Sequence, residues 1–432
     1  MIIGILGVFA FLLVINIPIS FVLCIVGTMF IIVTGVIPLD TIPHKMWNGL
    51  DQFVYTAIPM FMLSGEIMNE VGVTQRLVKV ASKCVGWISG GLAHVSILSA
   101  MVISGISGSA VADSVAIGTV LIPSMKKVGY RGADAAAIVA AACVNGPIIP
   151  PSNAMVVYSA ILGLSVGSLF IAGFVPGILI GLGLMVVCYI LAVKGKIPKT
   201  TSSSSDGKPG ESDRLHWVYD VILPASLPVV IIGGVIFGIA TATEVAAVAV
   251  LAATVYGFFV YRVLTVKKFL ACVSRCIIPT SIIFFLIAGS GALGIVFTLL
   301  HLPEQISSWV LELTKNRYIV LLIINGFLLF MGAIMDASAN LLILAPILAP
   351  VAIGLGVDPL HFALMFIVNI CIGMITPPVG SLLFSVCPIG KVSIGEIVAR
   401  IWPLLMVEIV VLLIITYVPA TVVWLPKLLH VY

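Results

Sequence analysis

The chain has 432 residues, of which 61% are hydrophobic and 9% are charged, with a formal net charge of +4. Soluble domains carry about 25% charged residues, so the composition excludes a soluble enzyme, a nucleic-acid-binding protein and a disordered scaffold. A helix needs about 20 apolar residues to cross a bilayer, which leaves room for roughly 10 to 14 passes. We therefore expect an all-α polytopic membrane protein that lies in a lipid bilayer.

The first half predicts a series of apolar helices with short breaks. Residues 1–39 contain no charge. This run is too long for one pass at about 1.5 Å per residue, so we expect a break at Asn16-Ile-Pro18. Arg76, Lys79 and Lys83 indicate an interfacial helix whose basic side chains reach the lipid headgroups. The other expected helices are 2–16, 18–37, 52–68, 87–104, 107–125, 133–145, 153–163 and 168–193.

One segment, 194–216, has the composition of a flexible linker, because it combines Ser, Pro, Gly and charge. Five of its eight charges are basic, which predicts a cytoplasmic location. It separates residues 1–193 from 217–432. In the second part we expect helices at 218–240, 243–262, 270–300, 318–334, 338–352, 361–372, 380–389 and 397–425, with a hairpin around 270–300 that breaks near Gly289-Ser-Gly291 and broken helices around 331–390.

The two parts are related by a gap-free alignment. In this alignment the loop 126–132 carries three basic residues, whereas its counterpart 353–359 carries none. Basic residues favour the cytoplasmic side, so a loop that has them and an equivalent loop that lacks them are expected on opposite sides of the membrane. We therefore expect an inverted repeat, a plan common in secondary transporters. The alignment pairs residues that fix backbone shape: Gly105 with Gly332, Pro123 with Pro350, Gly129 with Gly356, Gly146 with Gly373, and Pro150-Pro151 with Pro377-Pro378.

Residues 104–114 (SGISGSAVADS) form the first polar cluster, with four serines and two glycines between apolar arms. Small residues let a chain reverse inside the bilayer, and hydroxyl and carbonyl oxygens suit a hard cation. The alternative is close helix packing through small residues, with the serines bonded to their own helix. Asp113 favours a functional site, because an acid within the membrane is costly and usually functional.

Residues 144–153 (VNGPIIPPSN) form the second cluster, in which three prolines end a helix and release carbonyl groups. A simple proline kink is the alternative. The repeat contains both clusters again, at 331–340 and 373–381. Asp336 then takes the position of Ser109, and Asn340 that of Asp113. Two such pairs predict two ion sites beside one substrate site.

Other candidates have simpler interpretations. Thr241 and Glu244 have the spacing of a helix-capping box, and His94 is interpreted as a packed histidine. The sequence contains no GxxxxGK[ST] or HExxH motif. An intramembrane aspartyl protease and a channel remain as alternatives, although two occluding hairpins suit alternating access better than an open pore.

The stretch 90–130, followed by NGPIIPPS (145–152) and SVGSLFIAGFVPGILIGL (165–182), closely resembles the large membrane subunit of TRAP transporters, the tripartite ATP-independent periplasmic transporters. GIATATEVAAVAV (238–250) and GMITPPVG (373–380) fit the same family, and the resemblance covers essentially the whole chain. Ala242 departs from the proline common in the family's TPTE-like motif. The resemblance implies an elevator-type fold with a scaffold and a mobile domain that carries two inverted re-entrant hairpins.

The resemblance also implies a function, partners and a location. We expect a transporter rather than an enzyme, in the bacterial inner membrane, importing an organic acid of the sialic acid or C4-dicarboxylate class with sodium as the coupling ion. A periplasmic binding protein would deliver the acid. A small four-helix membrane subunit would be a separate chain, since no such segment precedes residue 1. A proton-coupled permease of the same fold and an intramembrane enzyme stay open as alternatives.

The family's ion sites use a hairpin tip and an unwound helix in each half. Asp113 and Asn340 are implied either as direct ligands or as supports. The substrate would bind between the tips, with its charge met by helix N-termini, hydroxyls and sodium rather than by an obvious arginine. The implied residues are Ser107, Gly108, Ser109, Asp113, Asn145, Gly146 and Ser152 for the first sodium site, Gly332, Asp336, Asn340, Gly373, Thr376 and Pro377 for the second, and Ser109, Pro150, Ser152, Asn153, Gly380 and Ser381 for the substrate.

Overall fold

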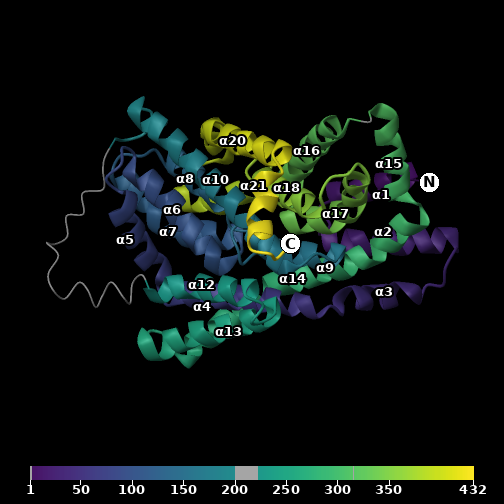
Figure 1. Ribbon diagram of the computed structural model, residues 1–432, viewed down its shortest axis with the longest axis horizontal. Coiled ribbons are helices and arrows are strands. Elements are labelled where there is room, and N and C mark those ends of the chain that lie inside the picture. Colours follow the sequence, from purple (N-terminus) through teal and green to yellow (C-terminus); the bar gives the residue numbers. More distant parts are fainter. Residues whose placement is uncertain (1, 200–221, 315) are drawn as a thin grey trace.

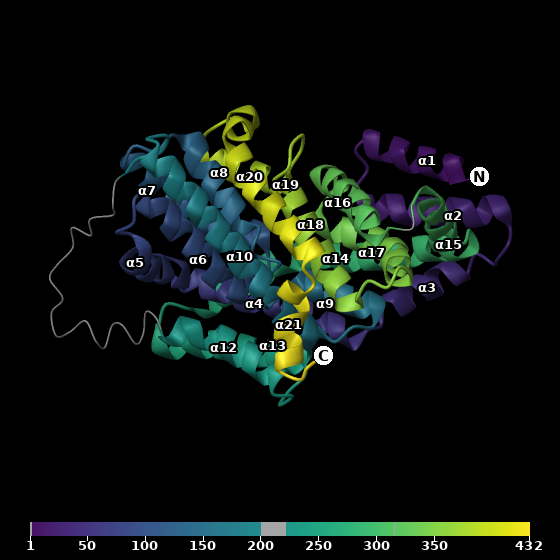
Figure 2. The same cartoon turned by 45° about the horizontal axis from the view of Figure 1, so that its top comes forward.

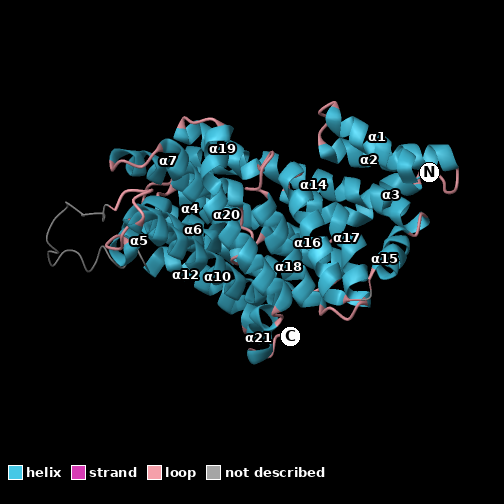
Figure 3. Cartoon of the chain, turned by 90° about the horizontal axis from the view of Figure 1, so that it is seen from above, coloured by secondary structure: helices cyan, strands magenta, loops and turns pink. Residues whose placement is uncertain are grey.

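The computed structural model describes residues 2–199, 222–314 and 316–432, and these residues form helices and connecting loops without a strand (Figure 3). Six of the described helices are long and apolar enough to cross a membrane. The expected all-helical membrane class is therefore confirmed. Most of the expected linker, residues 200–216, and the start of the helix expected at 218–240 lie outside the described residues.

The first half contains helices close to those expected, together with a further helix, α3. Within it, α6 and α7 pack together as a hairpin. The bounds are α1 Ile2–Val14, α2 Ile19–Thr34, α3 Thr41–Leu50, a short 3-10 helix Phe53–Thr56, α4 Ala57–Glu70, α5 Val73–Val85, α6 Gly91–Ser107, α7 Ala110–Lys127, α8 Gly132–Cys143, α9 Asn153–Leu162 and α10 Val166–Val193.

The second half repeats this order. Its hairpin consists of α16 and α17, and α18 and α19 are the two parts of a broken helix. The bounds are α12 Leu223–Ile236, α13 Ala242–Val255 with a π-helical turn Tyr256–Val260, α14 Val266–Leu299, α15 Leu302–Leu313, α16 Arg317–Ile334, α17 Ala337–Gly354, α18 Pro359–Gly373, α19 Ser381–Gly390, α20 Ile394–Tyr417 and α21 Ala420–Leu428.

The helix positions follow the alignment of the two parts. That alignment places Ala110–Lys127 on Ala337–Gly354, which are the full extents of α7 and α17, and it pairs Gly132 with Pro359, the first residues of α8 and α18. Helices α15, α16, α19 and α20 begin within two residues of the positions that α5, α6, α9 and α10 predict. The same register of helices therefore occurs twice in the chain. The inverted orientation of the two repeats stays a prediction.

The two halves pack by exchanging helices. Helix α14 of the second half packs against α2, α3 and α4 of the first, and α13 packs against α4 (Figure 1). Elsewhere α19 packs against α8 and against α7, which lies beside it in Figure 3. Helix α17 packs against α9 (Figure 2). Each hairpin thus lies against the broken helix of the other half. Ser114 of α7 and Ser385 of α19 share a hydrogen bond of 2.7 Å between their hydroxyl oxygens.

The prediction of a hairpin around 270–300 is wrong, because α14 is one continuous helix through Gly289-Ser-Gly291. These glycines allow close packing instead of chain reversal. A Cβ atom placed on Gly289 would lie 2.9 Å from the Ser20 carbonyl oxygen, and one on Gly291 would lie 2.8 Å from the Lys45 carbonyl oxygen. The second hairpin is α16–α17, whose tip falls within the range 331–340 that the repeat singles out.

Three smaller differences concern how the chain is divided into helices. The single helix expected at 397–425 is divided into α20 and α21 at Val418 and Pro419, because proline cannot donate to the helix ladder. Helices α3 and α15 were not expected as separate elements. Both carry polar residues among their apolar ones, so neither stands out as an apolar run. Helix α15 is the repeat counterpart of α5, the expected interfacial helix.

Candidate functional site

The first hairpin reverses at Gly108. Helix α6 ends at Ser107, and Gly108 adopts φ +63°, a left-handed conformation that suits glycine because it has no Cβ atom. Ser109 then caps α7, where its hydroxyl accepts a hydrogen bond from the Ala112 backbone nitrogen at 3.5 Å. The Ser109 nitrogen donates to the Ser107 hydroxyl at 3.2 Å. The tip therefore places two serine hydroxyls beside the first turn of a helix.

Asp113 fastens this tip. Its carboxylate is fully buried and accepts hydrogen bonds from the Ser107 hydroxyl and, at 3.3 Å, from the Ser104 hydroxyl. Both serines belong to α6, whereas Asp113 belongs to α7. The carboxylate therefore joins the two arms of the hairpin, and it also brings a negative charge next to Ser107 and Ser109.

The first broken helix lies directly against the tip. Helix α8 ends at Cys143, and Ser152 caps α9 by accepting from the Met155 nitrogen at 3.2 Å. A Cβ atom placed on Gly146 would lie 2.6 Å from the Ala110 nitrogen, and one on Gly108 would lie 2.5 Å from the Pro151 carbonyl oxygen. The structure thus brings Ser107, Gly108, Ser109, Asp113, Gly146 and the 150–152 segment into one cluster.

The break contains buried polar atoms without a partner in the protein. Asn145 is fully buried, and neither its amide oxygen nor its amide nitrogen has a hydrogen-bond partner. The amide oxygen of Asn153, a residue 8% exposed, also lacks one. Buried polar atoms usually have a hydrogen-bond partner, so we expect these atoms to contact a polar ligand. The Asn145 oxygen suits a hard cation.

The second hairpin repeats the arrangement with different chemistry. Asp336 caps α17, accepting from the Ser338 nitrogen at 3.0 Å. Asn340 is fully buried and donates to the carbonyl oxygens of Met331, at 3.2 Å, and Met335, at 3.0 Å. It therefore joins α17 to the end of α16, as Asp113 joins α7 to α6. Its own amide oxygen has no partner.

The second broken helix also contacts its own hairpin. A Cβ atom placed on Gly332 would lie 2.9 Å from the Gly373 Cα, and the Gly380 nitrogen donates to the Ala333 carbonyl oxygen at 3.2 Å. Thr376 donates to the Ile372 carbonyl oxygen at 2.9 Å, which leaves its hydroxyl oxygen able to accept or ligate. The Ser381 hydroxyl has no partner. Pro150-Pro151 and Pro377-Pro378 are both joined by cis peptide bonds.

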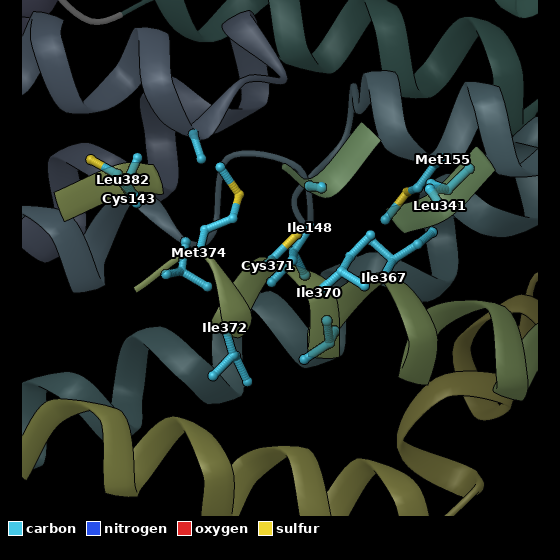
Figure 4. Packing of buried hydrophobic residues seen from close by; sticks show 14 of the residues in the cluster. Cys143, Ile148, Met155, Leu341, Ile367, Ile370, Cys371, Ile372, Met374 and Leu382 are labelled. Carbon is cyan, nitrogen blue, oxygen red and sulfur yellow. The ribbon is translucent and has the colours of Figure 1, made fainter. Parts of the chain in front are cut away.

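The two breaks belong to one packed core. Figure 4 shows Cys143 and Ile148 of the first broken helix in the same cluster as Cys371 and Met374 of the second. Non-helical backbone at membrane depth is tolerated where protein or a polar cavity receives it. The packing of both breaks within this core meets that condition.

A cavity of about 340 Å³ opens beside the first hairpin, between its tip and helices α4 and α14. Ser107, Ser109 and Asp113 line one wall. Of the residues expected to bind substrate, Ser109 lines this cavity, and Pro150, Ser152, Asn153, Gly380 and Ser381 do not.

Arg275 of α14 and Glu66 of α4 lie in the opposite wall of this cavity. Arg275 pairs with Glu66 (Nε to Oε1, 3.5 Å) and with Glu70 (Nη2 to Oε2, 2.8 Å). Sequence reasoning did not single out Arg275, because it lies in an apolar run without a motif. The signal that could have found it is its charge, since α14 is otherwise uncharged from residue 269 to its end.

Comparison with known proteins identifies the family. Residues 6–421 match the tripartite ATP-independent periplasmic transporter, DctM component. The sialic acid TRAP transporter large permease protein SiaM of Vibrio cholerae is 34% identical over 95% of this chain and 95% of its own length. The C4-dicarboxylate TRAP transporter large permease protein DctM of Pseudomonas aeruginosa is 38% identical over 93% of this chain and 92% of its own length.

The fold is also similar to that of a solved transporter. The Alcanivorax borkumensis YdaH transporter superposes with a TM-score of 0.63 over 89% of this chain and 88% of its own, at 14% sequence identity. That identity supports the fold alone. The sequence matches decide the family, and they indicate a transporter rather than an enzyme, in a bacterial inner membrane. The chain thus belongs to the DctM family, the large permease component of tripartite ATP-independent periplasmic transporters.

Proposed function

We propose that this permease imports an organic acid by sodium-coupled, elevator-type alternating access. The observation that carries the proposal is the pair of hairpin tips, each fastened to a broken helix that holds buried, unpartnered side-chain oxygens. One such pair would fit a structural kink. Two pairs at equivalent positions, each rich in hydroxyl and carbonyl oxygens, fit two sodium ions that order the tips before the substrate binds.

Sodium is a coupling ion here, and the residues around each tip suit it. In the first site, Ser107, Ser109 and Asn145 would supply oxygens. In the second, Asp336 and Thr376 would supply theirs. Asp113 and Asn340 act chiefly by holding the tips, because their hydrogen bonds run between the two arms of each hairpin.

The substrate class is an organic carboxylate. Relatives named for sialic acid and for C4-dicarboxylates match nearly the whole chain, and both ligands carry a carboxylate. The cavity beside the first hairpin supports this class, because its wall combines serine hydroxyls with the Arg275 guanidinium. Arginine recognises carboxylates with two parallel hydrogen bonds. A carboxylate in this cavity would compete with Glu66 and Glu70 for Arg275.

Two groups of helices can act as the two bodies of an elevator. Helices α2, α3, α4, α13 and α14 pack against one another and would form the scaffold. The hairpins and the broken helices, with α10 and α20, pack against one another and would form the mobile core. The core would carry the sodium ions and the acid inward as a rigid body, and the acid would leave Arg275 of the scaffold helix α14 as the core moves. Coupling requires that the ions bind the substrate-ready state more tightly than the alternative.

The proposal includes two partners: a small membrane subunit with four helices and a periplasmic binding protein that delivers the acid. The names of the family and of its relatives, tripartite, periplasmic and large permease, support both. Much of the choice between acids would then lie in the binding protein.

Uptake into proteoliposomes tests the proposal. The vesicles would contain this chain, its small partner and the cognate binding protein, with radiolabelled sialic acid, succinate or pyruvate outside. We expect uptake that needs both the binding protein and an inward sodium gradient, and that stops when potassium replaces sodium. Uptake driven by a proton gradient without sodium would refute the sodium sites and leave the fold intact.

A further inference from the structure

Glu408 is a buried acid that the proposed ion sites do not use. It lies on the inner face of α20, where its exposed fraction is 0%. Neither of its carboxylate oxygens has a hydrogen-bond partner in the protein. Asp113, the other fully buried acid among the described residues, has two serine donors. Glu408 therefore differs from a structural carboxylate that is held by its neighbours.

The surroundings of Glu408 contain little that could neutralise a negative charge. Helix α20 packs against α8, α10, α18, α19 and α21. Helix α18 contributes the buried thiol Cys371. Arg400, two turns before Glu408, is engaged by Asp134 of α8 at 3.5 Å. The remaining titratable groups on the packed helices are the buried thiols Cys143 and Cys188, His361 bonded to the Ile415 carbonyl, Cys387, and the exposed Tyr189 and Lys427.

The same part of the core holds a buried polar chain. Thr416 of α20 accepts from the Asn325 amide at 2.8 Å, and Asn369 of α18 donates to the Asn325 amide oxygen at 2.7 Å. All three residues are at most 2% exposed. The first half has no counterpart of Glu408 or of this buried polar chain. In the alignment of the two halves, the residues that match Glu408, Asn325, Asn369 and Thr416 are Gly181, Leu98, Ala142 and Tyr189.

An ionised carboxylate in such a place would be very costly, since nothing replaces the water it loses. It must bind a cation or a proton. A transition-metal ion would need further His, Cys, Asp or Glu ligands, and among the described residues no group of three or more such side chains could hold one. A sodium ion would need several oxygen ligands, and neither carboxylate oxygen of Glu408 has a hydroxyl or amide group as a hydrogen-bond partner that could also supply one. A proton neutralises the carboxyl group without further ligands. The geometry therefore favours a proton over a metal ion.

We propose that Glu408 is a proton-binding site in the mobile core and that transport depends on pH through it. Ionisation would place an unpaired charge between α20 and the helices packed against it, among them α18 and α19, the two parts of the second broken helix. Packing around the second sodium site would then loosen as the pH rises. The proposal rests on the transport function of the chain, but the presence of the proton can be measured without transport.

Infrared spectroscopy of the purified full chain with its small partner tests whether the carboxyl is protonated. We expect a carbonyl band of a protonated carboxyl group at neutral pH that disappears in Glu408→Gln. Glu304→Gln makes the same change at an exposed position of α15 and should leave the band in place. A band that is unchanged in Glu408→Gln would overturn the proposal, whatever the uptake experiments show.

The pH dependence of uptake tests the second part. In the wild type, sodium-driven uptake should fall about tenfold per pH unit once the pH passes the midpoint of the Glu408 titration. In Glu408→Gln, which imitates the protonated form, uptake should vary less than about twofold over the same range. An equal decline in both proteins would overturn the coupling to pH.

Thermal unfolding keeps the test valid where uptake is absent for other reasons. The midpoint temperature of the wild type should fall as the pH is raised, and that of Glu408→Gln should fall less. If Glu408→Gln does not fold, Glu408→Asp takes its place, because it must keep both the infrared band and the pH dependence. Loss of either in a folded Glu408→Asp would contradict the proposal. Normal infrared and unfolding results without uptake would instead count against the proposed transport function.

Discussion

Asp113 and Asn340 occupy equivalent positions, yet they hold their hairpins by opposite means. Asp113 accepts hydrogen bonds from serine hydroxyls, whereas Asn340 donates to backbone carbonyls. The first tip therefore has a negative charge of its own, and the second has a neutral amide with Asp336 at the helix cap. The charge that balances a sodium ion thus comes from different positions of the hairpin in the two halves.

The hydroxyl groups at the tips give the first prediction. Ser109→Ala and Thr376→Ala should each raise the sodium concentration for half-maximal uptake about ten- to a hundredfold, because each removes one oxygen that would contact the sodium ion, worth about 1.5–3 kcal/mol. Thr298→Ala is the matched control, since Thr298 makes the same bond to its own helix at an exposed position of α14. Unchanged sodium dependence in both variants would remove these positions from the ion sites.

Arg275 gives a prediction about the substrate. Arg275→Gln should raise the substrate concentration for half-maximal uptake by at least about tenfold, because a charge-assisted bond to a carboxylate contributes about 1.5–3 kcal/mol. The sodium dependence should change little. Lys268→Gln is the control: Lys268 also pairs with Glu70, at 3.5 Å, but does not line the cavity. If both variants behave alike, Arg275 serves the scaffold and not the substrate.

At the scale of elements, each hairpin tip works through its contact with a broken helix. Gly146 lies so close to Ala110 that any side chain would separate the two. Gly146→Ala should cost about 1–3 kcal/mol of stability through overpacking and should abolish the protection that sodium gives against heat. Thermal unfolding with and without sodium measures both effects.

Gly326→Ala provides the contrast, because Gly326 is an exposed helical residue of α16 with open space around it. Alanine there should be neutral or stabilising by up to about 1 kcal/mol. Sodium protection should persist. A Gly146→Ala protein that sodium still protects would show that the tip and the break are independent.

The sequence predicts the repeated elements well, because glycines and prolines fix backbone shape at both breaks and at the first tip. It misplaces the second hairpin, since Gly289 and Gly291 have the same composition as a chain reversal but serve close packing against α2 and α3. Composition cannot distinguish these two uses. Arg275 and Glu408 were missed for a related reason: their importance comes from which distant helices surround them, and a single sequence does not contain that information.

At the scale of the molecule, the exchange of helices between halves links the hairpins to each other. Ser114 and Ser385 connect α7 to α19, which lie in the two halves of the proposed core. Gly167 of α10 and Val235 of α12 meet instead where that core contacts helices outside it, and a Cβ atom on Gly167 would lie 2.9 Å from the Val235 Cγ1. Both pairs are close enough to accept an engineered disulfide.

Rigid-body movement predicts opposite results for these two disulfides. A bridge in Ser114→Cys/Ser385→Cys joins two parts that move together, so uptake should continue after oxidation. Helix α12 packs against α13 of the proposed scaffold. A bridge in Gly167→Cys/Val235→Cys therefore ties the core to the scaffold, so uptake should stop after oxidation and return on reduction. The single-cysteine variants control for the substitutions themselves, and the native exposed Cys84 would first be replaced by serine. Uptake that continues with the α10–α12 bridge closed would contradict an elevator that moves α10 past α12, because a covalent bond allows no sliding of the two helices.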